Sequence, residues 1–323
     1  MNGGCKRALV GASAAMATMA GVTLGAYALS NLLLHLAVDR QMPAALEKNR
    51  KKLSGSKEKA DLRLKAEQAA FRLRHSGCAR VELTAWDGTR LIGHWQEHPH
   101  PQRVLVAMHG WRSAWDQDFG LIAPFLEETG CSVLYVQQRG QQESGGSHMT
   151  FGILESRDCL SWANWVCSHT TDLPIYLAGV SMGASSVLMA SALSLPKQVK
   201  GIIADCGYTS PHAIWQHVSE KNLHLNYALH RAWVERLCRK RLKLQASAAS
   251  CPEALSRTKL PVLLIHGTAD RFVPVEMTYE NYRSCAGPRE LLIVPGAGHC
   301  MSYPTEPKRY EQALLEFWRR WDR

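Results

Sequence analysis

The segment with the clearest chemical potential is a serine between two glycines, Gly-Val-Ser-Met-Gly at residues 179–183. It follows an apolar run at 175–178 and precedes small and apolar residues at 184–195, a pattern typical of a strand, a sharp turn and a helix. Glycine on either side lets such a turn form, because no Cβ then crowds the neighbouring backbone. The turn would hold the Ser181 hydroxyl at the carboxyl edge of a sheet, at the start of a helix dipole. We therefore predict that Ser181 is a nucleophile.

A serine hydroxyl needs a base to take its proton and an acid to orient that base. Asp270 and His299 each follow a short apolar run that we predict to be a buried strand. The order Ser, Asp, His along the chain is the order used on a strand–turn–helix scaffold. We predict that Ser181, Asp270 and His299 form a catalytic triad. Asp205, which follows another predicted strand, is the alternative acid.

An oxyanion formed at Ser181 needs two backbone N–H donors that are already in place. We expect one from Met182, directly after the nucleophile, and the other from the His-Gly-Trp sequence after the apolar run at 104–108, most directly from the Trp111 amide. The first residue of that sequence, His109, is expected to be structural.

Two other groups of reactive side chains are not expected to form sites. His94, His98 and His100 lie close together at a predicted strand end and turn, but no Cys or carboxylate stands at ligand spacing. Cys300 is adjacent to His299, but adjacency in sequence does not make a catalytic pair. We predict neither a metal nor a cofactor.

The elements that must position these residues alternate between strand and helix. Runs at 80–84 and 91–95 flank a Trp-Asp-Gly-Thr turn, which signals a hairpin. Six nearly all-apolar runs are typical of strands buried on both faces of a parallel sheet: Val104–Met108, Ser132–Val136, Ile175–Ala178, Gly201–Ala204, Val262–Ile265 and Leu291–Val294. Helices are predicted at 115–129, 153–168, 182–194 and 305–321. The fold class is α/β, with one mostly parallel central sheet flanked by helices.

Residues 209–258, called the insertion below, interrupt this alternation with basic sequence of helical period. Residues 209–257 hold 8 Lys+Arg against 3 Asp+Glu. Leu229, Trp233 and Leu237 are four residues apart, which places them on one helix face. Because long loops inside compact domains are usually functional, we predict a helical lid over a pocket. A solvated helical excursion without a gating role is the alternative.

Together these motifs resemble the α/β-hydrolase superfamily, and most of all bacterial serine hydrolases that carry an N-terminal membrane anchor and are described as esterase-like. The resemblance covers residues 80–321 and rests on the sequences around Trp111, Ser181, Asp270 and His299. It implies an α/β-hydrolase fold for residues 80–323 and cleavage of carboxylic esters through an acyl-enzyme. Amide, peptide or thioester cleavage, or ligand binding by a non-catalytic protein of the same fold, remain alternatives.

One stretch departs from the family pattern. Where the family has Asp-x-Arg-Gly-x-Gly-x-Ser, this chain has Gln-Gln-Arg-Gly-Gln-Gln-Glu-Ser at 137–144. Gln137 and Gln142 thus replace Asp and Gly. Neither is a triad member, so we expect catalysis to survive and the hydrogen bonds of the loop to differ.

Residues 8–38 contain no Asp, Glu, Lys or Arg. A helix of that length would reach roughly 45 Å, longer than the roughly 30 Å core of a bilayer. We predict an uncleaved single-pass membrane anchor at 1–40 and a basic helical stalk at 41–79, with the side of the membrane left open. A signal peptide cleaved at Ala-Tyr-Ala, residues 26–28, is the alternative. Anchor and basic insertion favour an acyl-lipid or other amphiphilic ester as substrate.

The chain of 323 residues is long enough for one large domain. Its net charge is +10, of which residues 1–74 contribute +8, with 13 Lys+Arg against 5 Asp+Glu. Positive charge is therefore concentrated on the N-terminal appendage and the insertion, so we predict no nucleic-acid partner. The ten cysteines are scattered without a CxxC pair, which favours unpaired packing residues. The oligomeric state stays open.

Overall fold

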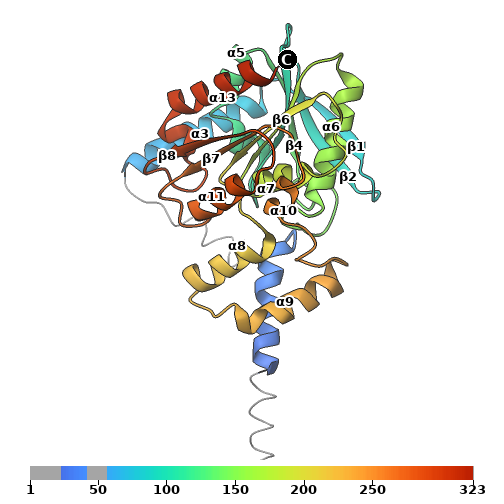
Figure 1. Cartoon of the computed structure of the whole chain (residues 1–323), viewed down its shortest axis with the longest axis vertical. Coiled ribbons are helices and arrows are strands. Elements are labelled where there is room, and N and C mark those ends of the chain that lie inside the picture. The colour runs from blue at the N-terminus through green and yellow to red at the C-terminus, as the bar shows by residue number, and fades with distance from the viewer. Residues whose placement is uncertain (1–22, 42–56, 323) are drawn as a thin grey trace, which may run out of the picture.

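The structure is a computed structural model that describes residues 23–41 and 57–322. Its centre is an eight-stranded sheet of order β1-β2-β4-β3-β5-β6-β7-β8 (Figure 1). The strands are β1 (Ala79–Thr84), β2 (Arg90–Gln96), β3 (Arg103–Met108), β4 (Cys131–Gln137), β5 (Ile175–Val180), β6 (Val199–Asp205), β7 (Val262–Gly267) and β8 (Arg289–Val294). The β1–β2 hairpin and the β2–β4 pair are antiparallel, and the other pairs are parallel.

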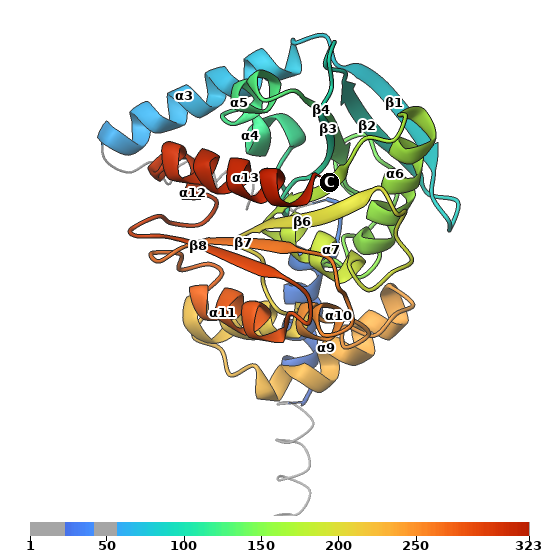
Figure 2. The ribbon, with the colours of Figure 1, turned by 45° about the horizontal axis from the view of Figure 1, so that its top comes forward.

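Helices cover both faces of this sheet, as Figure 2 shows. One apolar core lies between the sheet and α6 (Glu155–His169), α7 (Met182–Ala190) and α10 (Cys251–Leu255). The other lies between the sheet and α3 (Lys57–Arg74), α4 (Trp115–Phe119), α5 (Ala123–Glu128) and α13 (Pro307–Trp321). Two further helices are α11 (Val275–Ser284) and α12 (Ser302–Thr305). Strands β3, β4 and β7 are buried along their whole length, which explains why their sequences are nearly all apolar.

The predicted strands are all present, one predicted helix is divided, and helix α11 was missed. The helix expected at 115–129 is divided into α4 and α5, because Pro124 lacks an N–H and begins a new helix rather than continuing the old one. Helix α11 was not predicted. It follows Pro274 and buries only a narrow side, made by Met277, Thr278 and Asn281.

The insertion lies over the carboxyl ends of the strands. It contains α8 (Pro211–His217), a π-helical turn at Val218–Asn222 and α9 (Ala228–Arg241) before α10 returns to the core. The face predicted to pack on α9 is confirmed in part: Leu237 is buried and Trp233 contacts Tyr27, whereas Leu229 is 67% exposed. The buried positions are His230, Val234, Leu237 and Cys238. The packing of α9 against its neighbours therefore uses a stripe rotated from the one that leucine and tryptophan spacing predicted.

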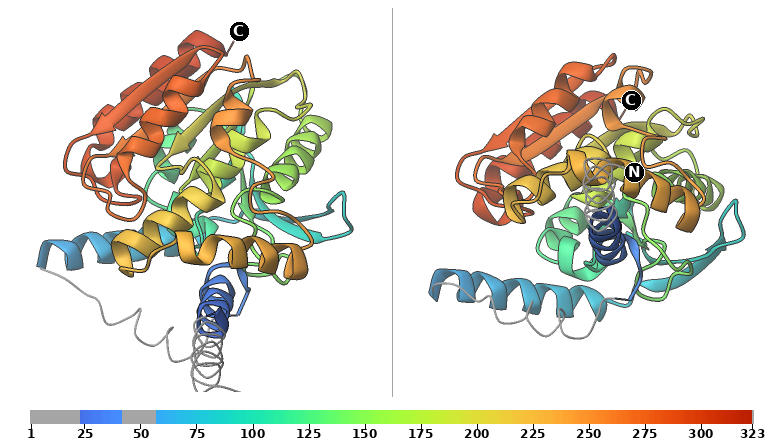
Figure 3. Two further views of the ribbon diagram at one scale, coloured as in Figure 1. Left: turned by 60° about the horizontal axis from the view of Figure 1, so that its bottom comes forward. Right: turned by 90° about the horizontal axis from the view of Figure 1, so that it is seen from below.

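A helix that precedes the first strand packs against the insertion. Residues 23–38 form a helix, the N-terminal helix, which lies beside α8 and α9 (Figure 3). Its Leu34 and Val38 are almost completely buried in a third apolar cluster with the insertion. Among the described residues no helix combines the length and the hydrophobicity that crossing a bilayer requires. Residues 1–22 of the predicted anchor lie outside the described residues.

The segment predicted as a stalk also contacts the body. Its residues 42–56 lie outside the described part, and α3 follows at Lys57–Arg74. Near its end α3 buries Ala69, Ala70 and Leu73, and Arg74 forms an ion pair with the buried carboxylate of Asp116 on α4. The second half of α3 is thus packed on the domain rather than projecting from it.

Candidate active site

Ser181 occupies a strained turn between β5 and α7, with φ 55° and ψ −115°. The two flanking glycines are required by space. A Cβ on Gly179 would lie 2.3 Å from the carbonyl oxygen of Gly183, and a Cβ on Gly183 would lie 1.9 Å from that of Met108. Strain of this kind, about 1–3 kcal/mol, persists only where the surrounding packing imposes it. Here the close approach of α7 to β3 imposes it on Ser181.

The three predicted triad residues lie in contact. The Ser181 Oγ is 2.9 Å from Nε2 of His299, and the His299 Nδ1 is 2.7 Å from Oδ2 of Asp270. The other carboxylate oxygen of Asp270 accepts hydrogen bonds from the backbone amides of Phe272 and Val273, each at 2.9 Å. The Asp270 side chain is fully buried, whereas the His299 side chain is 24% exposed. This geometry allows proton transfer between the serine and the imidazole, with the carboxylate fixing the ring.

A second histidine, His266 on β7, contacts the carboxylate of Asp270. Its Nε2 lies 3.2 Å from Oδ2 of Asp270 and its Nδ1 lies 2.6 Å from the hydroxyl of Thr278. Burial alone would raise the pKa of Asp270, but hydrogen bonds from His266, His299 and the Val273 amide lower it well below the usual value. Asp270 is therefore ionised at neutral pH. No feature of the sequence marks His266 as a supporting residue beyond its place four residues before Asp270.

The electrostatic setting of His299 favours its protonated form. Burial lowers the pKa of His299, whereas the neighbouring Cys206 sulfur and the Asp270 carboxylate raise it, and the net change is upward. Burial also raises the pKa of the Cys206 thiol well above its usual value, so this thiol is neutral. Of the two groups that raise the pKa of His299, only Asp270 carries a charge at neutral pH.

The alternative acid, Asp205, has a different partner. Its Oδ1 accepts a hydrogen bond of 2.8 Å from the Ser302 hydroxyl. Burial raises the pKa of Asp205 to about 6, because the hydrogen bond from Ser302 only partly offsets desolvation. The carboxylate that contacts His299 is that of Asp270.

The two amides predicted to bind an oxyanion lie on the loops beside Ser181. A Cβ on Gly110 would be 3.4 Å from the Cβ of Ser181, so the loop after β3 directly adjoins the nucleophile. Within the described residues, neither the Trp111 amide nor the Met182 amide donates to a protein acceptor. Asp118, which sequence reasoning missed, fixes this loop by accepting from the Gly110 amide at 2.6 Å and from the Ser113 hydroxyl at 2.5 Å.

The loop that departs from the family pattern is held by its glutamines. Gln137 lies 2.8 Å from the His94 Nε2 and accepts from the Glu143 amide at 2.8 Å. Gln142 donates to the Ser113 carbonyl at 2.7 Å. It therefore contacts the loop after β3 that bears the Trp111 amide, called the oxyanion loop below. His109 is fully buried, and burial lowers its pKa, which fits a neutral structural role.

The histidines considered as metal ligands are otherwise engaged. His94 stacks on Trp115 with ring centroids 4.1 Å apart, and the His98 Nδ1 accepts from the His100 amide. Over the described ranges, 23–41 and 57–322, the one group of three candidate ligands is a different one, made by Cys206, His299 and Cys300.

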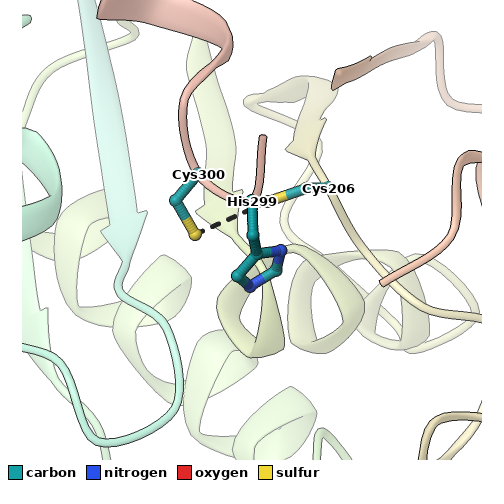
Figure 4. Close-up of side chains that lie close together, drawn as sticks. All are labelled: Cys206, His299 and Cys300. Carbon is teal, nitrogen blue, oxygen red and sulfur yellow. Dashed lines mark hydrogen bonds between the residues drawn. The ribbon is translucent and has the colours of Figure 1, made fainter. Parts of the chain in front are cut away.

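Figure 4 shows this group, in which the two sulfurs lie 3.7 Å apart beside the imidazole. Both nitrogens of His299 already contact Ser181 and Asp270. The group is therefore not arranged as a metal site.

A cavity of about 180 Å³ opens beside Ser181. Its walls are almost entirely apolar and come from three parts of the chain: Leu33, Leu34, Leu36, Ala37, Trp111, Phe151, Ser181, Tyr208, Ile214, Trp215, Val218, Ser219, Leu223, Tyr227, His230, Val234 and Phe272. A larger cavity of about 720 Å³ lies between α3, α4 and α12, but neither Ser181, Asp270 nor His299 lines it. The smaller cavity is the one that a substrate of Ser181 would occupy.

Residues 104–313 match the model of the Alpha/beta hydrolase family. The chain belongs to this family. Among curated relatives, Uncharacterized protein YqkD of Bacillus subtilis is 26% identical over 230 residues, which cover 69% of this chain and 73% of that protein. Uncharacterized protein YfhR of Escherichia coli K12 is 24% identical over 245 residues, covering 73% and 79%.

Solved structures, one of them an esterase, share the fold of this α/β hydrolase. The Pyrococcus furiosus esterase Pf2001 superposes with a TM-score of 0.62 at 22% identity, covering 76% of this chain and 92% of that one. Est1E from Butyrivibrio proteoclasticus superposes with a TM-score of 0.57 at 19% identity, covering 75% and 98%. At these identities the likeness establishes the fold, and the chemistry has to be argued from the site.

Proposed function

We propose that this α/β hydrolase cleaves carboxylic esters through an acyl-enzyme on Ser181. The observation that carries the proposal is the unbroken chain of contacts from Ser181 Oγ through His299 to the ionised Asp270, at 2.9 and 2.7 Å. Such a chain can remove the serine proton as the oxygen attacks an electrophile. The apolar lining of the cavity beside Ser181 supports an uncharged substrate.

The reaction follows from these contacts in two halves. His299 Nε2 takes the proton of Ser181 Oγ while this oxygen attacks the ester carbonyl, and the amides of Trp111 and Met182 donate to the resulting oxyanion. When the tetrahedral intermediate collapses, His299 returns the proton to the leaving alkoxide and an alcohol departs. Water then attacks the acyl-enzyme with His299 again as base, and a carboxylic acid is released. Asp270 stays ionised and keeps the proton of the imidazole on Nδ1.

Esters fit this site better than charged substrates. No Asp, Glu, Lys or Arg lines the cavity within the described residues, so a charged group would lose its hydration there without gaining a partner. One solved neighbour, the Pyrococcus furiosus Pf2001 protein, is an esterase, which also supports ester cleavage. We extend the proposal to an amphiphilic ester delivered at a membrane, because residues 8–38 carry no charged side chain.

The test is covalent labelling and turnover of the full chain. We expect a fluorophosphonate probe to label the wild type and p-nitrophenyl esters to be hydrolysed. Ser181→Ala should lose both while keeping the wild-type circular dichroism and melting temperature, because it removes one buried hydroxyl oxygen. Hydrolysis that persists in Ser181→Ala would refute the assignment. A folded wild type that neither reacts with the probe nor cleaves any ester would favour a ligand-binding role for the same pocket.

A further inference from the structure

One wall of the cavity beside Ser181 is formed by the N-terminal helix, and residues of the insertion line another part. Four lining residues, Leu33, Leu34, Leu36 and Ala37, come from this helix, which precedes the family domain by more than sixty residues of sequence. Leu34 is 2% exposed and packs in the same apolar cluster as Met182 and Tyr208. The pocket beside Ser181 is therefore incomplete without a segment that the sequence predicts to be only an anchor.

Specific contacts hold this wall against the insertion. Three links run along the length of the helix to α9, namely an edge-to-face ring contact between Tyr27 and Trp233 at 5.3 Å, a 2.9 Å contact between Ser30 Oγ and His230 Nδ1, and an ion pair between Asp39 and Arg241. The Ser30 side chain is fully buried, and the hydroxyl also donates to the Ala26 carbonyl. Because polar and ionic links define register more closely than apolar packing, the helix has one fixed position on α9.

The end of the same helix also contacts the oxyanion loop. The indole N–H of Trp111 donates to the Ala37 carbonyl at 2.8 Å. The guanidinium of Arg112 donates to the carbonyls of Leu36 and Asp39 at 3.1 and 2.6 Å. Carbonyls at a helix C-terminus have no partner inside the helix, and a cation is favourable there. The N-terminal helix thus both walls the cavity and positions the loop that bears the Trp111 amide.

The size and lining of the cavity define what it can hold. Its volume is about 180 Å³, slightly more than the roughly 150 Å³ of an engineered apolar cavity that binds benzene. An apolar group of about six carbons, as a ring or as a chain, would therefore fill it. Either the acyl part or the alcohol part of an ester could supply such a group.

We propose that the N-terminal helix forms a specificity wall, through Leu33 above all, and limits the uncharged apolar group of the substrate to about six carbons. This inference rests on the proposed ester hydrolysis at Ser181. The half-buried side chain of Leu33 lines the cavity, while the adjacent Leu32 is 49% exposed and does not line it. The two neighbours therefore offer a matched pair for substitution.

The experiment measures size preference in the full chain. One series varies the acyl chain of p-nitrophenyl esters from acetate to decanoate, and the other varies the alcohol of acetate esters from methanol to octanol. Leu33→Ala should move the optimum to longer groups, with kcat/KM rising about fourfold per extra buried methylene. Leu33→Trp should move it to shorter groups. Leu32→Ala and Leu32→Trp should keep the wild-type profile, and the series that shifts identifies which part of the ester occupies the cavity.

A binding measurement separates this inference from the proposed reaction. Calorimetry with ethyl hexanoate in the Ser181→Ala background should show affinity that falls about tenfold or more on adding Leu33→Trp and stays unchanged on adding Leu32→Trp. If the wild type cleaves no ester but this binding difference appears, hydrolysis is refuted and the wall stands. If esters are cleaved through Ser181 but neither profile nor affinity responds to Leu33, the wall is refuted and hydrolysis stands.

Discussion

Asp270 is the residue on which the chemistry of the site depends most. Its carboxylate accepts hydrogen bonds from two backbone amides and lies beside two histidines, so it stays ionised although it is fully buried. The ionised carboxylate in turn raises the pKa of His299. A base with a raised pKa is protonated, and inactive, over a wider range of acidic pH.

This predicts the pH dependence of the enzyme. His299 must be neutral to accept the serine proton, so kcat/KM should rise with pH, and its acid limb should lie above 6.5, the ordinary pKa of histidine. Asp270→Asn removes the charge that stabilises the imidazolium. The limb should then move to lower pH, and kcat should fall on the order of 10,000-fold. The pH–rate profiles of both proteins check this, and a limb that stays at the wild-type pH in Asp270→Asn would contradict it.

Sequence and structure agree on the residues that have a local signature. Ser181 stands between two glycines at a predicted strand–turn–helix, and Asp270 and His299 follow apolar strands in the required order. Asp118 and His266 have no such signature, because their roles arise from contacts made after the chain has folded. The role of Asp118 becomes clear only in the folded structure, where its carboxylate accepts a hydrogen bond from the Gly110 amide.

At the scale of elements, the position of the nucleophile depends on how closely α7 approaches β3. A Cβ on Gly183 would meet the Met108 carbonyl oxygen at 1.9 Å, and that oxygen belongs to a backbone in the middle of the sheet. A strand with neighbours on both sides cannot shift without breaking its ladder. The separation between α7 and β3 is therefore set by the absence of one methyl group.

We accordingly expect Gly183→Ala to be strongly destabilising. Overpacking of this kind costs about 3 kcal/mol, which for a chain of this size lowers the melting temperature by roughly 4–5 °C. Gly298→Ala is the matched control, because the nearest atom to its added Cβ is 3.9 Å away on the flexible side chain of Met301. Thermal unfolding of both variants tests the argument. Equal melting temperatures would show that α7 can move away from β3.

The elements also show where sequence patterns stop being informative. Strands buried on both faces are predictable because every residue is apolar, whereas the surface that α9 buries depends on its partners. Leu229 was expected to be buried, but it is exposed. The contacts of α9 with the N-terminal helix run instead through Trp233, His230 and Arg241. The role of the N-terminal helix as a pocket wall could not be predicted either. A charge-free segment suits both a bilayer and a protein core, so its composition does not distinguish the two.

At the scale of the whole molecule, the N-terminal segment divides into two parts with different expected roles. Residues 23–41 contribute the cavity wall and the contact with Arg241. Residues 8–22 continue the charge-free sequence. We keep the proposal that this sequence brings the enzyme to a membrane, and the two parts can be removed separately.

Two truncations test this division. Removing residues 1–22 should shift the protein from the membrane fraction to the supernatant while esterase activity stays within about twofold of wild type, since every contact described for the cavity remains. Removing residues 1–41 should reduce kcat/KM on the order of 100-fold or more, because Trp111 loses its supports and the cavity loses a wall. Sedimentation and ester hydrolysis are the measurements. Full activity after the longer truncation would refute the structural role of the helix.

The same helix has a consequence for how the protein is made. Ser30 and His230 are 200 residues apart in the chain, and Asp39 and Arg241 are 202 apart. At about 5–20 residues per second, a ribosome adds His230 and Arg241 roughly 10–40 s after it has added their partners Ser30 and Asp39. During that interval Leu34 and Val38 have been synthesised and the surface that buries them has not. The nascent chain must therefore shelter an apolar helix elsewhere, in a chaperone or at a bilayer, before the helix can take its place in the finished enzyme.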